Sequence, residues 1–283
     1  MQAHADAARA VGRRLALVPT MGALHRGHLR LVDDARRRGD HVTVSIFVNP
    51  TQFGPGEDFE AYPRTLDADL SALREAGGVD AVFAPSAEAM YPFGLPPYAT
   101  VRVRDLDRHL CGATRPGHFE GVTSVVTKLF LACRPHVAVF GQKDAQQLAI
   151  LRRMTDELGF GIEIAGHPIV REPDGLALSS RNRYLSLEER AQATVLSEGL
   201  DRARQLVAGG ARDAGLVARA IRDHIETAPL ARVQYVEVVD AATLQPVETL
   251  VQERGSEGRY LAAVAVFFGG TRLIDNATLV VGE

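Results

Sequence analysis

The sequence predicts an α/β protein with a parallel sheet in its N-terminal domain and a smaller α+β domain at its C-terminus. Two observations carry this prediction. Strand-like and helix-like segments alternate over the first 170 residues, and after about Arg171 helices come first and strands follow. We therefore expect two domains, residues 1–170 and residues 171–283.

In the N-terminal domain, short apolar or β-branched runs predict buried strands, and apolar residues at helical spacing predict the helices between them. The expected strands cover residues 15–18, 42–48, 79–84, 137–140 and 162–165, and the expected helices cover residues 28–38, 67–76, 122–133 and 145–158. Alternation of this kind favours parallel strands with helices on both faces of the sheet.

The C-terminal domain is expected to begin after a polar loop, residues 172–184. Two helices follow, over residues 187–208 and 213–227, and then three strand-like runs over residues 233–239, 260–268 and 273–281. These three runs predict a mainly antiparallel sheet.

Composition and charge narrow the class of protein. The chain is 46% hydrophobic and 24% charged, contains no apolar run of about 18 residues, and lacks an apolar stretch near its start that would predict a secretory signal. We therefore expect a cytoplasmic protein whose two cysteines, Cys111 and Cys133, are reduced. The formal net charge of −3 predicts neither a nucleic-acid nor a membrane partner, although it leaves a local basic patch open.

The strongest local signal is the segment 19–28, which reads PTMGALHRGH. A strand ends at Val18 and a helix begins near Gly27, so His25 and His28 lie on one face, one turn apart. A helix N-terminus at the carboxyl end of a strand suits phosphate binding, and two imidazoles can add donors to phosphoryl oxygens. The alternative is a capping histidine beside a partly buried one, with no ligand.

Two further segments suit the same chemistry. Residues 178–182 (LSSRN) lie at the expected domain boundary, where two hydroxyls and the Arg181 guanidinium could hold the β- and γ-phosphates. Taken alone, this segment is equally a polar loop with a helix cap. Residues 141–144 (GQKD) follow a strand; Lys143 there suits ATP phosphates, while Asp144 suits a helix cap or a ribose.

Lys128 and Lys143 are the only lysines among 32 basic residues. We expect Lys128, inside the helical stretch 122–133, to be a solvated or snorkelling side chain. Gln52, after the strand 42–48, and Gln147, on the helix after residue 144, could hydrogen-bond a small hydroxy acid without adding net charge. Singly, each glutamine is as well explained as polar surface.

A family resemblance joins these segments. Residues 25–28 resemble the HxGH signature of class I adenylyl- and nucleotidyl-transferases, residues 178–182 resemble their KMSKS-type loop, and PTMGALHRGH resembles pantothenate synthetases (pantoate–β-alanine ligases) in particular. The resemblance covers nearly the whole chain. It implies a Rossmann-like domain (residues 1–170) that binds ATP and pantoate, a lid domain (residues 171–283), Mg²⁺ with ATP, a pantoyl-adenylate intermediate and a homodimer.

The resemblance also implies the residues of the site. Its catalytic groups are His28, His25, Lys143, Ser179, Ser180 and Arg181. The implied ATP-binding residues are Met21, Gly22, Ala23, Leu24, His25, Arg26, Gly27, His28, Gly141, Gln142, Lys143, Asp144, Val170, Leu178, Ser179, Ser180 and Arg181. Gln52 and Gln147 would bind pantoate and β-alanine, Asp69 would contact Mg²⁺, and residues 115–121 (RPGHFEG) would support the site.

This chain departs from the family pattern at three positions. Leu178 stands where many members have Met, which conserves volume, Gln142 stands where Glu is frequent, and Ala68 lacks a carboxylate that some members carry.

Two rival functions stay open. A nucleotidylyltransferase would share the HxGH segment but would leave the nucleotide on its product. A non-catalytic ATP sensor would keep the fold without needing the pyrophosphate-stabilising groups.

Overall fold

The computed structural model describes residues 1–252 and 257–282, which form two compact units. Unit 1 comprises Met1–Asp107, Arg115–Gln142 and Ile150–Ile169. Unit 2 comprises Arg108–Thr114, Lys143–Ala149 and Val170–Glu283. Two short segments that precede Val170 in the sequence, 108–114 and 143–149, therefore belong with unit 2.

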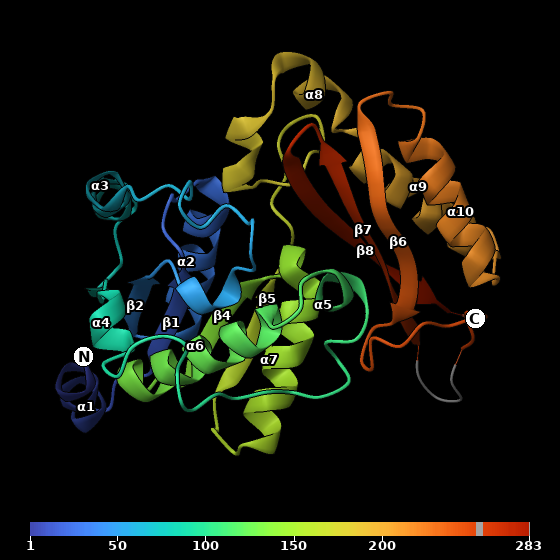
Figure 1. Cartoon of the computed structure of the whole chain (residues 1–283). Coiled ribbons are helices and arrows are strands. Elements are labelled where there is room, and N and C mark those ends of the chain that lie inside the picture. Colours follow the sequence, from blue (N-terminus) through green and yellow to red (C-terminus); the bar gives the residue numbers. More distant parts are fainter. Residues whose placement is uncertain (253–256, 283) are drawn as a thin grey trace. The chain divides into compact units, whose positions relative to one another are not determined.

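Unit 1 is built on a five-stranded parallel sheet of order β3-β2-β1-β4-β5. Its strands are β1 (Leu15–Thr20), β2 (His41–Ile46), β3 (Ala81–Phe83), β4 (Val137–Gly141) and β5 (Glu163–His167). The strand order reverses between β1 and β4, and ligands of open α/β sheets bind at the carboxyl ends of strands beside such a point. This arrangement confirms the predicted parallel sheet (Figure 1).

Helices cover both faces of this sheet. Side chains from alternate positions of β1, such as Ala16 and Val18, form one core cluster with Leu31, Val32 and Ala35 of helix α2 (Arg26–Arg38). The other face meets α1 (Gln2–Ala10) and α6 (His118–Cys133), both of which contact β1. The remaining elements of this part of the chain are η1 (Pro50–Gln52), α3 (Leu66–Ala76), α4 (Ala87–Met90), η2 (Gln142–Asp144) and α7 (Ala145–Glu157).

Unit 2 contains a three-stranded antiparallel sheet of order β6-β7-β8. Its elements are α5 (Leu110–Thr114), η3 (Ser180–Tyr184), α8 (Leu187–Gln192), α9 (Val195–Ala208), α10 (Ala214–Ile225), β6 (Ala231–Asp240), β7 (Gly258–Phe268) and β8 (Thr271–Val281). Apolar residues of α9 and α10, including Leu200 and Ile221, share one core with β7 residues such as Val264 and Val266. The predicted α+β organisation is confirmed.

The single helix predicted over residues 187–208 is wrong, because the structure divides it at Ala193 and Thr194 into α8 and α9. The reason is tertiary: α9 buries an apolar face, whereas α8 buries no residue and exposes 92% of Leu187. Helix α1 (Gln2–Ala10), which precedes the first strand, was not predicted from the sequence pattern.

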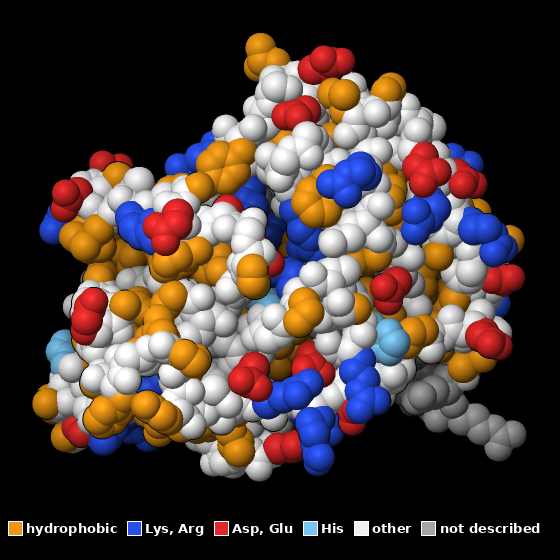
Figure 2. All heavy atoms as spheres, in the orientation of Figure 1, with side chains coloured by type: hydrophobic (Ala, Val, Ile, Leu, Met, Phe, Trp, Pro, Cys, Tyr) orange, Lys and Arg blue, Asp and Glu red, His pale blue; other side chains and the backbone are white. Residues whose placement is uncertain are grey.

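No helix within the described part of the chain is long and apolar enough to cross a bilayer. Acidic and basic side chains are interspersed over the face of the molecule in Figure 2, with no large area of a single charge on the visible surface of unit 2.

Candidate active site

The two histidines of the first motif form a reciprocal cap on helix α2. His25 is the N-cap residue, and its Nδ1 accepts from the Gly27 N–H at 3.1 Å, while Nδ1 of His28 accepts from the His25 N–H at 3.3 Å. The rings stack with centroids 4.0 Å apart. Because both Nδ1 atoms accept hydrogen bonds, a neutral imidazole at either position carries its proton on Nε2. The backbone thus turns both rings into Nε2–H donors at the N-terminus of α2.

The loop that delivers these histidines is held by a buried carboxylate. Asp69 is 3% exposed, and its two oxygens accept from the backbone N–H groups of Ala23 and Leu24 at 3.0 and 2.7 Å. Gly22 has a φ of +78°, and a Cβ there would lie 2.9 Å from an Asp69 oxygen. Ala23 also has a positive φ, of 49°, which costs free energy that the Asp69 bonds offset. The sequence pattern missed this role of Asp69.

Asp69 is also the predicted magnesium contact. Among residues 1–252 and 257–282, no group of three or more His, Cys, Asp or Glu side chains could hold a metal ion. One carboxylate that already accepts two backbone N–H bonds fits only a magnesium ion whose other ligands are phosphate oxygens and water.

Gln52 ends η1, which follows β2, and its carboxamide is held on both sides. Its Oε1 accepts from Nδ2 of the buried Asn49 at 3.1 Å, and its Nε2 donates to the sulfur of Met21 at 3.0 Å. Gly121 of α6 lies so close that a Cβ there would be 2.3 Å from the Thr51 carbonyl oxygen. Only glycine lets α6 approach η1 this closely.

The segment 115–121 holds the backbone of Gln52. The Gln52 carbonyl accepts from Nδ1 of His118 at 2.7 Å and from Nη2 of Arg115 at 3.3 Å. Arg115 in turn forms a bidentate ion pair with Glu57, at 2.6 and 2.7 Å. The bonds and charge of Arg115 outweigh the burial of Glu57 and lower its carboxyl pKa to about 2. This segment therefore fixes the backbone of Gln52, while its role in the reaction stays a prediction.

The other predicted ATP-binding residues of unit 1 lie at the carboxyl ends of β1 and β4. Met21, Leu24, Arg26 and Gly27 belong to the loop after β1 or the first turn of α2, whereas Gly141 ends β4 and Gln142 follows it. In this unit the structure brings together His25, His28, Asp69, Met21 and Gln52, of which Met21 bridges the histidine loop and the glutamine.

Unit 2 carries the second group of predicted residues. Lys143 has a half-buried side chain whose Nζ lies 3.8 Å from Asp144, and its carbonyl accepts from Nδ2 of Asn276 at 2.8 Å. Gln147 lies on the first turn of α7, in the segment that belongs with unit 2, whereas Gln52 belongs to unit 1.

The predicted loop 178–182 extends from a small hairpin in unit 2. Val170 accepts from the Leu178 N–H at 2.9 Å, and Arg171 pairs with Ala177. Ser179 caps η3 through its side chain, which accepts from the Arg181 N–H at 3.3 Å, so Ser180 and Arg181 occupy its first turn. The hairpin is tied to β8 by a bidentate pair between Arg171 and Asp275, at 2.6 and 3.0 Å.

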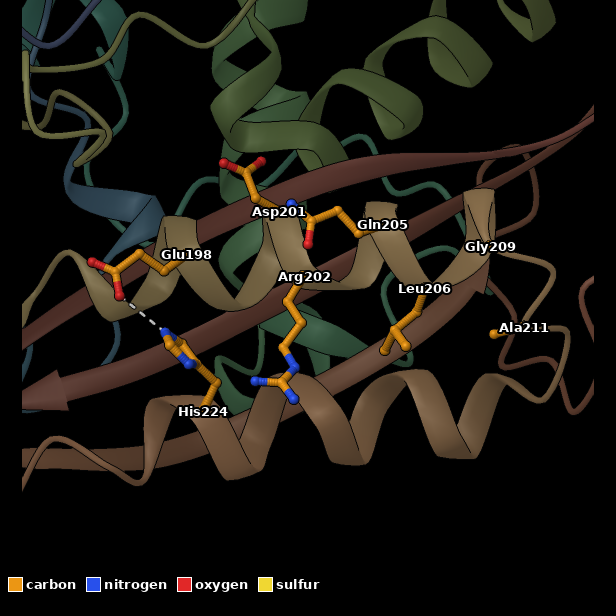
Figure 3. Close-up of a pocket in the computed structure, with 8 residues that line it drawn as sticks. All are labelled: Glu198, Asp201, Arg202, Gln205, Leu206, Gly209, Ala211 and His224. Atoms are coloured by element: carbon orange, nitrogen blue, oxygen red, sulfur yellow. Dashed lines mark hydrogen bonds and ion pairs between the residues drawn. The ribbon is translucent and has the colours of Figure 1, made fainter.

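Three other features involve none of the predicted site residues. Lys128 is half-buried on α6, with Nζ 5.4 Å from the centre of the Tyr91 ring, so it packs on an aromatic face. Burial raises the pKa of the Cys133 thiol to about 12. The surface hollow between α9 and α10 in Figure 3 is lined by residues such as Arg202 and by the His224–Glu198 pair, 3.0 Å apart, and by none of the predicted residues.

The doubly wound strand order and the histidine cap on the helix after β1 define a nucleotide-binding α/β protein of the HxGH type. Comparison with known proteins identifies the family. Residues 1–278 match the model of the pantoate-beta-alanine ligase family, and the chain belongs to this family.

Individual relatives agree. Pantothenate synthetase of Salinibacter ruber is 62% identical over 98% of this chain and 94% of its own length. A pantothenate synthetase structure from Thermus thermophilus has a TM-score of 0.88 at 46% identity and covers 96% of both chains. The ligase of Francisella tularensis, whose structure contains β-γ ATP and β-alanine, has a TM-score of 0.74 at 31% identity, covering 94% of this chain and 89% of its own.

The protein is therefore an ATP-dependent ligase that condenses pantoate with β-alanine. This result confirms the predicted family and activity and decides against a nucleotidylyltransferase and an ATP sensor.

Proposed function

We propose that the condensation proceeds in two steps through a pantoyl-adenylate. In the first step a carboxylate oxygen of pantoate attacks the α-phosphorus of ATP, and the bond to pyrophosphate breaks. In the second step the free amine of β-alanine attacks the acyl carbon, AMP leaves, and the amine proton goes to solvent. The nucleophile of the first step is already anionic, so catalysis there consists mainly of positioning and charge stabilisation.

The observation that carries this proposal is the reciprocal histidine cap. Both Nδ1 atoms are occupied by backbone N–H groups, so His25 and His28 are poised to donate from Nε2 to phosphoryl oxygens of ATP as negative charge develops. The helix N-terminus behind them favours the same charge. Residues 21–28, Gly141 and Gln142 would line the ATP site on unit 1.

Unit 2 would supply the groups for the departing pyrophosphate. Lys143 contributes an ammonium, Ser179 and Ser180 contribute hydroxyls and Arg181 contributes a guanidinium, all of which suit phosphate oxygens. Asp144, Val170 and Leu178 would complete the ATP contacts of this unit. We further propose that residues 171–283 act as a lid over a nucleotide-binding domain formed by residues 1–170.

Gln52 is proposed to bind pantoate and Gln147 to contact pantoate or β-alanine, because amides bond hydroxyl and carboxylate groups without adding charge. Mg²⁺ would arrive with ATP and contact Asp69, and it would neutralise phosphate charge when bound. We place the reaction in the cytoplasm, where ATP is available, and propose a homodimer, which light scattering after size-exclusion chromatography would test.

The order of steps is tested with pantoate carrying ¹⁸O in its carboxylate. An adenylate intermediate transfers one labelled oxygen to AMP. Label in inorganic phosphate would instead establish an acyl-phosphate route and overturn the proposal. With pantoate alone, release of pyrophosphate should match the enzyme concentration, while AMP stays in the bound adenylate. Addition of β-alanine should then release AMP and permit further turnovers.

A further inference from the structure

A chain of buried hydrogen bonds in unit 1 connects Tyr91 to Gln52. Tyr91 follows helix α4 and is 5% exposed, and its hydroxyl donates to Oδ1 of Asn49 at 2.6 Å. Asn49 is 1% exposed, and its Nδ2 donates to Oε1 of Gln52 at 3.1 Å. Tyr91 is therefore two hydrogen bonds away from the proposed pantoate ligand.

The direction of this chain follows from backbone groups that can act in only one way. Nδ2 of Asn49 faces the carbonyl of Gly121 at 3.1 Å, which can only accept. Oδ1 of Asn49 faces the N–H of Thr51 at 3.4 Å, which can only donate. Asn49 therefore donates an N–H to Gln52, and the Gln52 atom that accepts this bond is Oε1. Its Nε2 then points away from Asn49.

Tyr91 is the strongest donor to the oxygen that anchors this arrangement. Oδ1 of Asn49 accepts hydrogen bonds from the Tyr91 hydroxyl at 2.6 Å, from the Thr51 hydroxyl at 3.0 Å and from the Thr51 N–H at 3.4 Å. Burial raises the pKa of the Tyr91 phenol, so its proton stays in place. Lys128 over the ring, 5.4 Å from its centre, adds a cation–π contact that restrains the ring.

We propose that Tyr91 is a positioning residue that, through Asn49, orients the Gln52 carboxamide and thereby sets the affinity for pantoate. The proposal rests on the proposed role of Gln52 in binding pantoate. A carboxamide oriented in this way offers N–H donors, which suit a carboxylate or the oxygen of a hydroxyl. With the carboxamide reversed, its carbonyl oxygen would face the anionic substrate and repel it.

The test is a double-mutant cycle of Tyr91→Phe and Gln52→Ala, read in the KM of pantoate, the KM of ATP, kcat and the melting temperature. Tyr91→Phe keeps the ring and the Lys128 contact but removes the donor. Tyr98→Phe, the same change in a residue that is 93% exposed, is the matched control. Because Tyr91 acts through Gln52, the two changes should not be additive.

We expect Gln52→Ala to raise the KM of pantoate, and Tyr91→Phe to raise it roughly three- to ten-fold, the scale of one weakened hydrogen bond. The KM of ATP should stay within about two-fold in Tyr91→Phe and in Tyr98→Phe, because the bond that Tyr91→Phe removes is made to Asn49 and to no group proposed to bind phosphate. In the Gln52→Ala background, Tyr91→Phe should have no further effect on pantoate.

Two kinds of failure are distinguishable. A silent Gln52→Ala variant would overturn the role of Gln52 and the positioning proposal with it. An effective Gln52→Ala combined with a silent or additive Tyr91→Phe would overturn only the positioning by Tyr91, as would an equal rise in both KM values. If Tyr91→Phe folds poorly, Thr51→Val removes the second hydroxyl donor from the same Asn49 oxygen, and no rise in the KM of pantoate there would overturn the proposal.

Discussion

The histidine loop of unit 1 (residues 21–28) and the serine loop of unit 2 (residues 178–182) are both proposed to act on ATP, but they are held differently. In the histidine loop, backbone N–H groups donate hydrogen bonds to the buried Asp69. The two histidine rings of this loop cap helix α2. The serine loop is half-exposed, and its local hydrogen bonds include a serine cap and a bond from Asn182 to the Ala177 carbonyl at 3.0 Å.

The difference indicates a division of labour. A loop fixed by a buried carboxylate keeps its donors in one geometry without a ligand, which favours preorganised stabilisation of charge. The serine loop is half-exposed, and a loop of this kind is suited to adjust to the phosphates that it is proposed to bind and to release them, since segments with little buried surface open at low free-energy cost. Two matched pairs of residues, Lys143 with Lys128 and Asp69 with Asp275, allow the two units to be compared directly.

The largest expected effect separates the two lysines, one in each unit. Lys143→Ala should lower turnover by about 10²–10³-fold, the scale of losing one preorganised donor. Lys128→Ala, which loses the cation–π contact with Tyr91 but no group proposed to bind phosphate, should change turnover by no more than about two-fold. Single-turnover AMP formation measures both, and an equal loss in the two variants would contradict the assignment of the phosphate site.

Asp69→Asn and Asp275→Asn form a matched pair of buried carboxylates. Asp275 is 2% exposed and pairs with Arg171, so its neutralisation should cost up to about 3 kcal/mol of stability by leaving a guanidinium without its counter-charge. Asp69 binds backbone N–H groups, and an amide there sets an N–H against one of them, which should displace the histidine loop.

We therefore expect Asp275→Asn to lower mainly the melting temperature and Asp69→Asn to lower adenylate formation by more than its melting temperature explains. Calorimetry and single-turnover kinetics on the same preparations decide this. Full adenylate formation by folded Asp69→Asn protein would show that Asp69 does not position the loop.

His28 should have two separable roles, because its Nδ1 caps the helix and its Nε2 is proposed to meet ATP. His28→Ala should lose about 10²-fold in rate and about 1 kcal/mol of stability. His28→Asn keeps an acceptor near Nδ1 and should recover stability, whereas His28→Gln extends a donor toward Nε2 and should recover part of the rate. A His28→Ala protein that is unstable but fully active would show that His28 only caps the helix and does not contact ATP.

The smallest expected effect is a loss of stability in weak acid. Burial lowers the pKa of His41 below 6.5, the nearby Asp80 only partly opposing it, and its Nε2 lies 3.0 Å from that of His4. Since the unfolded chain takes up this proton first, the contribution of His41 is complete above pH 6.5 and is lost as the pH falls through the lowered folded pKa.

The melting temperature should therefore fall by a few degrees between about pH 7 and 5, and by less in His41→Gln. Glu57, whose pKa is about 2, loses its contribution only as the pH falls from about 4.5 toward 2 and does not interfere. If the melting temperature of His41→Gln falls with pH as much as that of the unchanged protein, another group is responsible for the loss of stability.

Much of this protein was determined by local sequence. The alternation of apolar runs predicted all five parallel strands and the three antiparallel strands to within a few residues, because strand and helix periodicities are local properties of the backbone. The segments PTMGALHRGH and LSSRN indicated the family without any contact being known. The position of a histidine at a helix start was likewise predictable from the motif.

Tertiary structure alone decided which distant groups meet. Asp69 reaches the histidine loop across 46 positions and Tyr91 reaches Asn49 across 42, separations at which periodicity carries no information. The break between α8 and α9, and the membership of residues 143–149 in unit 2, likewise depend on packing that no local window contains. Motifs specify the groups that do chemistry, whereas long-range burial selects the groups that orient them, because a buried polar atom must find its partner wherever the fold supplies one.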